Sequence, residues 1–380
     1  MKKLIAIFAV LLFVAPAFAA DWSFYGSQRV ATWYVDRDYG SSANNVNGQD
    51  DDQATQWYFQ GNSRLGAKVK ADKISGQIEL GLGSASTGSV AGDGADTNVT
   101  TRRAYGTWKF SDNAWFKVGK DYSPVTDFVS NQWFNADNDL LGEGNFYGRR
   151  PAGLTLGLGN FELAALTPSY GADVGTTATG INGTTGGDPD SYIPRFEASY
   201  NLVLGPGYIK PFAGFQYYSV EETGLGNVTG DIDVWSWLLG ISTNWNIGAF
   251  SIGGQLSYGV NEGAVTGWST GSNARTASLP TLKNGDDTDD VATIQALLVA
   301  ALKFTDTLRF EAGVGYRNDD PDASGLKKDE VWAVYLQAMI TMAPGVFLCP
   351  EVGYYDYMDN TAGNSQGNLW YAGAKWQIDF

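Results

Sequence analysis

Apolar and polar residues alternate with a period of two along most of this chain, and helical periodicity is nearly absent. In the C-terminal segment one face carries Trp370, Ala372, Ala374, Trp376, Ile378 and Phe380. Residues 63–70 and 76–83 follow the same rule. Such alternation predicts strands with one apolar and one polar face. A soluble β-sandwich alternates in the same way, so the pattern alone leaves the fold class open.

The connections between the predicted strands are alternately short and long. The seven short ones lie near residues 72–73, 111–113, 159–160, 206–207, 246–248, 305–306 and 344–345. The eight long ones lie near residues 36–56, 84–100, 122–148, 169–191, 221–231, 261–290, 319–329 and 358–367. Strict alternation places all long loops on one side, as in outer-membrane barrels with short periplasmic turns and long external loops. The sequence therefore predicts an all-β fold, a transmembrane antiparallel β-barrel of about sixteen strands.

Aromatic residues gather near the predicted strand ends. Examples are Trp22, Phe24, Trp33, Trp57, Trp108, Trp235, Trp370, Trp376 and Phe380. Membrane interfaces favour such rings, whereas a sandwich would bury them in strand centres. Their clustering beside turns favours the barrel over a sandwich core.

The first twenty residues read as a targeting segment. Lys2 and Lys3 precede an apolar run over residues 4–14, and Ala17-Phe18-Ala19 follows. A basic start, a short apolar core and an A-x-A site predict a cleaved signal peptide over residues 1–20. The alternative, a membrane anchor, would need a longer apolar run to span about 30 Å. We expect residues 21–380 to form a single barrel domain, which would enter a membrane as strands.

Composition excludes several classes of function. Among 380 residues there are 41 acidic and 25 basic side chains, no histidine, and one cysteine, Cys349. The acidic excess argues against DNA or RNA as a partner. The absence of histidine removes Ser-His-Asp and Cys-His catalysis and imidazole metal ligands. We therefore expect no enzyme activity, no cofactor and no metal site.

Several segments resemble the Gram-negative general porins, which are trimeric diffusion channels of sixteen strands. Residues 62–68 resemble their second-strand signature S-R-x-G-x-K, and residues 102–108 resemble their R-x-A-aromatic stretch. Residues 118–124 resemble the G-R-x-x-x-P before their constriction loop, with Lys120 in place of the usual arginine. Residues 22–26 resemble their first strand.

The C-terminal residue is part of the same resemblance. Phe380, with Ile378 and Trp376 on its face, is similar to the signal that barrel-insertion machinery reads in this family. The resemblance therefore implies that this machinery is a partner during assembly.

The resemblance also implies a constriction inside the barrel. In the family the third long loop folds into the pore, and here that loop spans about residues 122–148. Its acidic residues are Asp127, Asp137, Asp139 and Glu143. The basic residues expected to face them from the wall are Arg29, Arg64, Arg102 or Arg103, and Arg149 or Arg150. Opposed rows of acidic and basic groups would create a field across the pore that favours polar solutes.

Two of these expectations also follow from strand geometry. Arg64 alternates with Leu65, so an outward Leu65 turns Arg64 into the lumen, because a charge on the lipid face costs about 2–4 kcal/mol. Arg102 and Arg103 are adjacent, and adjacent strand residues face opposite sides. Only one of the two is therefore expected to face the lumen, and the other to lie at a strand end or headgroup. For each loop carboxylate, a simple solvated loop charge is the alternative.

The implied function is a water-filled channel for passive diffusion of small hydrophilic solutes and ions across a bacterial outer membrane. The implied partners are two further copies in a homotrimer, and lipopolysaccharide with the other outer-membrane lipids. The acidic loops weakly favour cations.

Three rival functions remain. One is a substrate-selective outer-membrane channel for a sugar or an anion, with a binding site in the lumen. Another is an outer-membrane hydrolase, which the lack of histidine disfavours. The last is a soluble secreted β protein.

Overall fold

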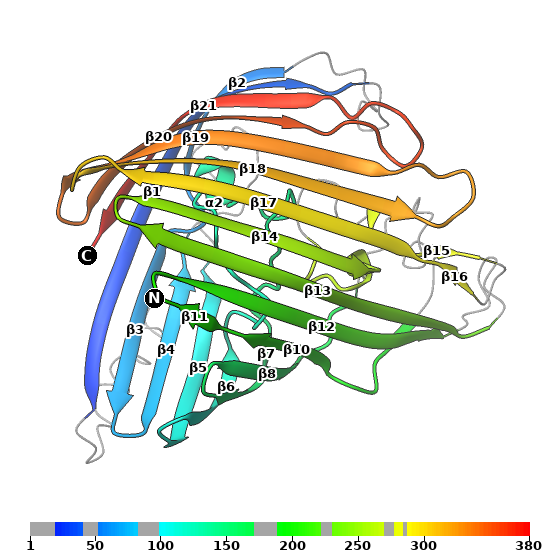
Figure 1. Ribbon diagram of the computed structural model, residues 1–380, viewed down its shortest axis with the longest axis horizontal. Helices are drawn as coiled ribbons and strands as arrows, with labels where there is room; N and C mark the ends of the chain where they lie inside the picture. Colours follow the sequence, from blue (N-terminus) through cyan, green and yellow to red (C-terminus); the bar gives the residue numbers. More distant parts are fainter. Residues whose placement is uncertain are drawn as a thin grey trace.

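The computed structural model describes residues 20–40, 52–82, 99–170, 188–221, 230–269, 277–283 and 287–380. Most of these residues lie in one antiparallel sheet, shown in Figure 1. The predicted signal peptide over residues 1–20 lies outside the described residues, apart from its last residue. No helix in the described ranges has the length and apolar character needed to cross a membrane.

The first half of the sheet is built from β1 (Asp21–Asp38), β2 (Asp52–Phe59), β3 (Arg64–Ala71), β4 (Ile74–Gly81), β5 (Thr100–Ser111), β6 (Ala114–Lys120), β7 (Ala152–Leu158), β8 (Phe161–Leu166), β9 (Asp188–Asp190), β10 (Arg195–Tyr200) and β11 (Leu202–Leu204). The second half is built from β12 (Gly207–Glu221), β13 (Ile232–Ile247), β14 (Phe250–Val260), β17 (Val291–Lys303), β18 (Leu308–Pro321), β19 (Asp329–Ala343), β20 (Val346–Asp356) and β21 (Asn368–Asp379). Its long connections hold α2 (Phe134–Asp137), η3 (Glu262–Ala264) and a small hairpin of β15 (Thr281–Leu282) and β16 (Thr288–Asp289).

Some of these segments are pieces of one barrel strand. Both β2 and β3 pair with β1, and β9, β10 and β11 all pair with β12. Counted this way, the described residues form sixteen barrel strands, each antiparallel to its neighbours, which confirms the predicted number. The ring closes where β1 pairs with β21, from Ser27 opposite Asp379 to Asp38 opposite Asn368. Closure satisfies the backbone hydrogen bonds of the first and last strands and leaves no free sheet edge.

The two faces of the wall differ in chemistry. On β17 the outward side chains of Ile294 and Leu298 are exposed, whereas the inward side chains of Thr293 and Gln295 are buried. The same rule holds on β13, where outward Leu239 is exposed and inward residues are buried. An apolar outer band around a closed barrel is the surface that a lipid bilayer requires.

The predicted rhythm of short and long connections is confirmed. All seven short turns lie where the alternation placed them, and glycines with positive φ occupy several, including Gly159 (φ 60°) and Gly248 (φ 63°). A side chain would be strained in that left-handed conformation, which explains glycine there.

Two of the long connections fold back against the inner wall. The inner loop, residues 121–150, joins β6 to β7 and carries α2, which lies inside the ring in Figure 1. A second inner segment, residues 261–269, follows β14 and was not predicted from the sequence. Trp268 of this segment is fully buried, and its indole nitrogen donates to Glu197 of β10 (2.8 Å).

The aromatic residues divide between the two faces. Trp57, Trp108, Trp235 and Phe380 are exposed on the outside, as a membrane interface would favour. Trp33 was wrongly expected among them. It points into the barrel, where its ring forms T-shaped, edge-to-face contacts with those of Phe134 and Tyr371, with centroids 5.6 Å apart in each case. Its position near a strand end concealed the inward direction set by the strand alternation.

Candidate pore constriction

Carboxylates of the barrel wall hold the inner loop through its backbone. Glu311 of β18 accepts from the backbone nitrogen of Asn131 (2.8 Å). Glu351 of β20 accepts from the backbone nitrogens of Trp133 (2.6 Å) and Phe134 (2.9 Å). Hydrogen bonds to a charged acceptor are roughly twice as strong as neutral ones. The acids of this wall therefore fix the loop and do not face open solvent.

Asp137 of α2 is the second anchor, and it joins the loop to the seam between the first and last strands. Its carboxylate contacts Arg29 of β1, the ammonium of Lys375 of β21 (3.3 Å) and the side-chain amide of Gln60 (2.9 Å). Lys375 also lies over the ring of Trp133, 3.2 Å from its centroid. Burial opposes ionisation of Asp137, but the charges of Lys375 and Arg29 keep its pKa below the usual value. We call this group of residues the Asp137 anchor. It brings together one predicted pair, Arg29 and Asp137.

The other predicted loop acids have different surroundings. Asp127 accepts hydrogen bonds from the hydroxyls of Tyr208 (2.9 Å) and Ser242. Glu143 is buried and accepts from the side-chain amide of Asn138 (3.1 Å). Burial and the nearby charge of Asp137 raise the pKa of Asp139 well above its usual value. Among the described residues, neither Asp127 nor Asp139 forms an ion pair with a predicted arginine.

Arg102 and Arg103 both point into the barrel, so the expectation that they face opposite sides is wrong. Glu79 of β4 lies opposite Arg103, and the next residue of β4 lies opposite Thr101, which leaves Arg102 as the extra residue of a β-bulge. A bulge breaks the alternation of side-chain direction over one residue. The Arg102 guanidinium then reaches Glu79 (2.9 Å), while that of Arg103 reaches Asp121 (2.7 Å).

These arginines belong to a positively charged surface that we call the basic wall. It lies on the inner side of β3–β6 and at the two ends of the inner loop. It consists of Arg64, Arg102, Arg103, Lys117, Arg149 and Arg150. Two carboxylates lie among these cations: Glu79, 3.8 Å from Arg64, and Asp121, 2.7 Å from Lys117. Burial disfavours the charged form of Asp121, yet hydrogen bonds and charge from Arg103 and Lys117 lower its pKa.

Tyrosines separate the cations of the basic wall. The Tyr122 ring lies beneath the guanidinium groups of both Arg103 (5.2 Å to the centroid) and Arg150 (5.1 Å). Arg150 also donates to the Tyr122 hydroxyl (3.1 Å) and lies over Tyr147 (6.0 Å). Burial raises the pKa of Tyr147, although the positive charges of Arg150 and Arg149 act against this rise. Stacking on tyrosine holds the guanidinium groups in fixed positions.

Sequence reasoning missed several residues of this site. Lys375, Glu311 and Glu351 lie at inward positions of their strands, and each follows the alternation that the sequence already displays. Their charge at inward positions was the signal that could have identified them. Tyr122 and Tyr147 carried no comparable signal, because they lie in a loop.

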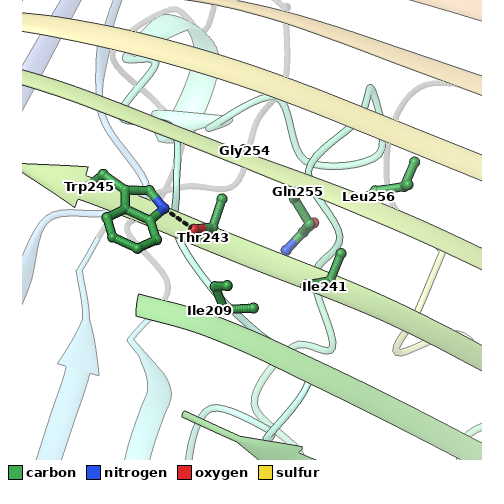
Figure 2. Close-up of a pocket in the computed structure, with 7 residues that line it drawn as sticks. All are labelled: Ile209, Ile241, Thr243, Trp245, Gly254, Gln255 and Leu256. Atoms are coloured by element: carbon green, nitrogen blue, oxygen red, sulfur yellow. Dashed lines mark hydrogen bonds between the residues drawn. The ribbon is translucent and has the colours of Figure 1, made fainter. Parts of the chain in front are cut away.

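A separate depression lies on the outer surface, away from the lumen. It has a volume of about 360 Å³ and is lined mainly by outward residues of β12, β13 and β14. Figure 2 shows Ile209, Ile241 and Leu256 around it, with the Trp245 indole donating to the Thr243 hydroxyl (2.7 Å). Because Gly254 has no side chain, the apolar band is hollow here. In the parts of the chain that the structure describes, no three or more His, Cys, Asp or Glu residues gather to hold a metal ion.

Comparisons with known proteins agree with this architecture. No protein-family model matches the chain, and no curated protein matches it. Solved structures do. The outer membrane channel DcaP of Acinetobacter baumannii is similar with a TM-score of 0.66 and 16% identity, over 94% of this chain and 97% of that one. The anion-selective porin from Comamonas acidovorans has a TM-score of 0.57 and 13% identity, over 95% and 100%. The trimer form of OmpT, an outer membrane protein of Vibrio cholerae, has a TM-score of 0.54 and 15% identity, over 94% and 99%. The chain therefore has the fold of the outer-membrane porins, a closed antiparallel β-barrel.

Proposed function

We propose that this chain forms a water-filled pore for passive diffusion of small hydrophilic solutes and ions across the outer membrane of a Gram-negative bacterium. The observation that carries this proposal is the contrast between the two faces of one closed ring. The outside is an exposed apolar band, and the inside carries the basic wall beside the inner loop. Charged groups on the inside of a membrane barrel are stable only where water or counter-charges reach them.

Planar bilayers test the proposal directly. The purified full chain, refolded in detergent, is added to a bilayer and the current is recorded in symmetrical salt. Stepwise conductance that rises linearly with the salt concentration supports a general pore. A protein that is folded by circular dichroism but gives no conductance would contradict it.

We do not propose catalysis. The chain has no histidine, and the buried carboxylates Glu311 and Glu351 hold backbone groups of the inner loop. A hydrolase assay on phospholipid and casein is expected to give no activity above that of the detergent buffer.

A substrate-selective channel is the second candidate, and the stacked Arg103, Tyr122 and Arg150 favour it. A guanidinium held on an aromatic ring presents a flat, charged surface on which a solute can bind. Flux that saturates as the concentration of a sugar or an anion rises would favour this candidate over a general pore.

We further propose that residues 1–20 are removed on export and that Phe380, Ile378 and Trp376 serve as the insertion signal. The three C-terminal side chains are exposed on the outer face, available to a receptor. Removal of Phe380 is expected to lower the yield of assembled barrel in cells while leaving refolding in detergent intact. Equal loss in both would indicate a purely structural role. Mass spectrometry of the exported protein tests cleavage at residue 20.

A homotrimer is the proposed assembly, in contact with lipopolysaccharide and the other outer-membrane lipids. Support comes from the outer face of β4 and β5, where Gly76 lies opposite Gly106 and leaves a flat surface against which a second barrel could pack. Native mass spectrometry is expected to give three copies. Replacing Gly106 with Trp is expected to give monomers, and a trimer that survives this change would exclude this face.

A further inference from the structure

We infer that the pore selects anions, because the surface along which ions pass is the basic wall. The part of the wall that carries Glu311 and Glu351 is covered by the inner loop. This inference rests on the proposed pore function. It differs from the weak cation preference that the acidic loops suggest, because a passing ion responds to the charges that water can reach.

The basic wall carries an excess of positive charge. Its six cations face two carboxylates, Glu79 and Asp121, and the excess is four positive charges. Among the described residues, neither Arg149 nor Arg150 forms an ion pair with a carboxylate. Lys68 of β3 extends the wall, with its ammonium over Tyr25 (5.2 Å to the centroid).

The acids of the barrel interior lie mostly where ions cannot reach them. Glu351 and Glu311 are 4% and 2% exposed, because the inner loop covers them. Glu262 of the second inner segment is fully buried beside Gln295 and Arg317. At the Asp137 anchor, the two wall cations Arg29 and Lys375 outweigh the single charge of Asp137. These acids therefore add little negative potential to the open part of the lumen.

Two loop acids remain partly exposed, and neither reverses the sign. Asp127 lies at the far wall, hydrogen bonded to Tyr208 of β12 and Ser242 of β13. Asp139 lies beside Asp137, and its partial burial together with the charge of Asp137 raises its pKa, which favours the neutral form. Between the inner loop and the basic wall, the balance of accessible charge is positive.

The basic wall is reachable and its charges are held in place. Arg64 and Arg103 keep 22% and 23% of their side-chain surface exposed, and Arg149 is exposed. Fixed charges within a Debye length of about 8 Å act strongly on an ion in a narrow passage. Loop charges farther away are screened by salt, so the net charge of −16 does not decide which ion passes.

The test is the reversal potential of the refolded full chain in a KCl gradient. We expect chloride to pass more readily than potassium. In the variant with both Arg149→Gln and Arg150→Gln, we expect the chloride-to-potassium permeability ratio to fall about threefold for each charge removed. The control variant, with Lys73→Gln and Lys303→Gln, removes two charges at exposed short turns and is expected to leave the ratio unchanged.

A second test changes one charge in an already assembled channel. Arg150→Cys is treated with a thiosulfonate reagent that carries either a positive or a negative charge. The positive reagent is expected to restore anion preference and the negative one to lower it further. The native thiol, Cys349, is 1% exposed, so the unsubstituted protein serves as the control for labelling.

The outcomes separate this inference from the pore proposal. No conductance at all would defeat the pore itself. Conductance that prefers potassium, or neither ion, would overturn anion selection and leave the pore standing. The chloride-to-potassium permeability ratio could also stay unchanged in the arginine variants and after treatment with the charged reagents. That result would show that the basic wall does not cause the selectivity, which also overturns the inference.

Discussion

The interior of this barrel has two unlike halves. Along β17–β21 and β1, the inner loop lies against the wall, and apolar side chains such as Leu140, Val299 and Tyr335 pack between them. Along β3–β6 the basic wall is free of loop cover except at the loop's two ends, where Tyr122 and Tyr147 stack on arginines. Apart from the bulge at Arg102, the strands of both halves alternate in the same way, so the alternation does not account for the position of the loop.

The cause is the kind of charge that each half presents to the loop. A carboxylate can accept several backbone N–H groups, as Glu351 does, and so can hold a chain segment that has no charge of its own. Arginines only donate, and here Arg102 and Arg103 donate to the side chains of Glu79 and Asp121. Glu351 thus binds N–H groups of the loop backbone, while Arg102 and Arg103 bind carboxylates of their own half.

The largest expected effect comes from breaking the Asp137 anchor. Asp137→Asn leaves Arg29 and Lys375 buried without a counter-charge, and loss of one partner of a buried ion pair costs about 3–5 kcal/mol. We expect the inner loop to detach from the seam, and single-channel records to show larger and noisier conductance. Asp306→Asn, which removes an exposed pair with Lys303 at a short turn, is the control and is expected to leave the records unchanged. Quiet, native conductance in Asp137→Asn would mean that the wall carboxylates alone hold the loop.

A smaller effect is expected where the loop touches the wall most closely. Gly315 of β18 lies beneath the backbone carbonyl of Glu143, and a Cβ at Gly315 would overlap that oxygen. Gly315→Val should therefore destabilise the docked loop by about 1–3 kcal/mol, since overpacking of a close contact costs this much. The expected result is faster amide hydrogen exchange in residues 138–146 and raised conductance.

The matched control for this variant is Ala312→Val on the same strand. Ala312 faces outward and is exposed, so its enlargement should change neither exchange nor conductance. Equal protection of the loop amides from hydrogen exchange in both variants would show that the contact at Gly315 does not hold the loop.

The sequence predicted the strands of the barrel wall better than the contacts made inside the barrel. The strand number follows from the alternation of short turns and long connections. The common face of Trp376, Ile378 and Phe380 follows from a period of two, which each strand displays independently of the others. The bulge at Arg102 could not be predicted this way, because it depends on how β5 pairs with β4 and not on β5 alone.

Pairing across the lumen was the hardest part to predict. The loop acids were expected to face the wall arginines. Among the described residues Asp137 forms such an ion pair, and its carboxylate is shared between Arg29 and Lys375, a lysine that the sequence did not single out. The path of a long loop inside a barrel is set by contacts to strands more than two hundred residues away, such as Gln132 with Tyr371. The local pattern of apolar and polar residues carries no information about such contacts.

The smallest expected effect concerns Asp139, the loop acid with no arginine partner. Because its pKa is raised in the folded protein, its contribution to stability is fully present below the ordinary carboxyl pKa of about 4 and is lost as the pH rises through the raised value. Asp139→Asn removes this loss of stability at high pH. The left-handed backbone at position 139 (φ 55°) suits asparagine. Thermal unfolding in detergent is expected to show no difference from the native chain at pH 4 and a gain of about 1 kcal/mol or less at pH 8.

The control for Asp139 is Asp306, whose pKa is shifted in the opposite direction. A hydrogen bond and charge from Lys303 lower the pKa of Asp306, so the stability that Asp306 contributes is present above its ordinary pKa and is lost as the pH falls. Asp306→Asn should therefore lose stability at pH 8 and approach the native chain in acid. If Asp139→Asn behaves like Asp306→Asn, then Asp139 is ionised and paired in the folded barrel, and the covered half of the interior is more acidic than its contacts indicate.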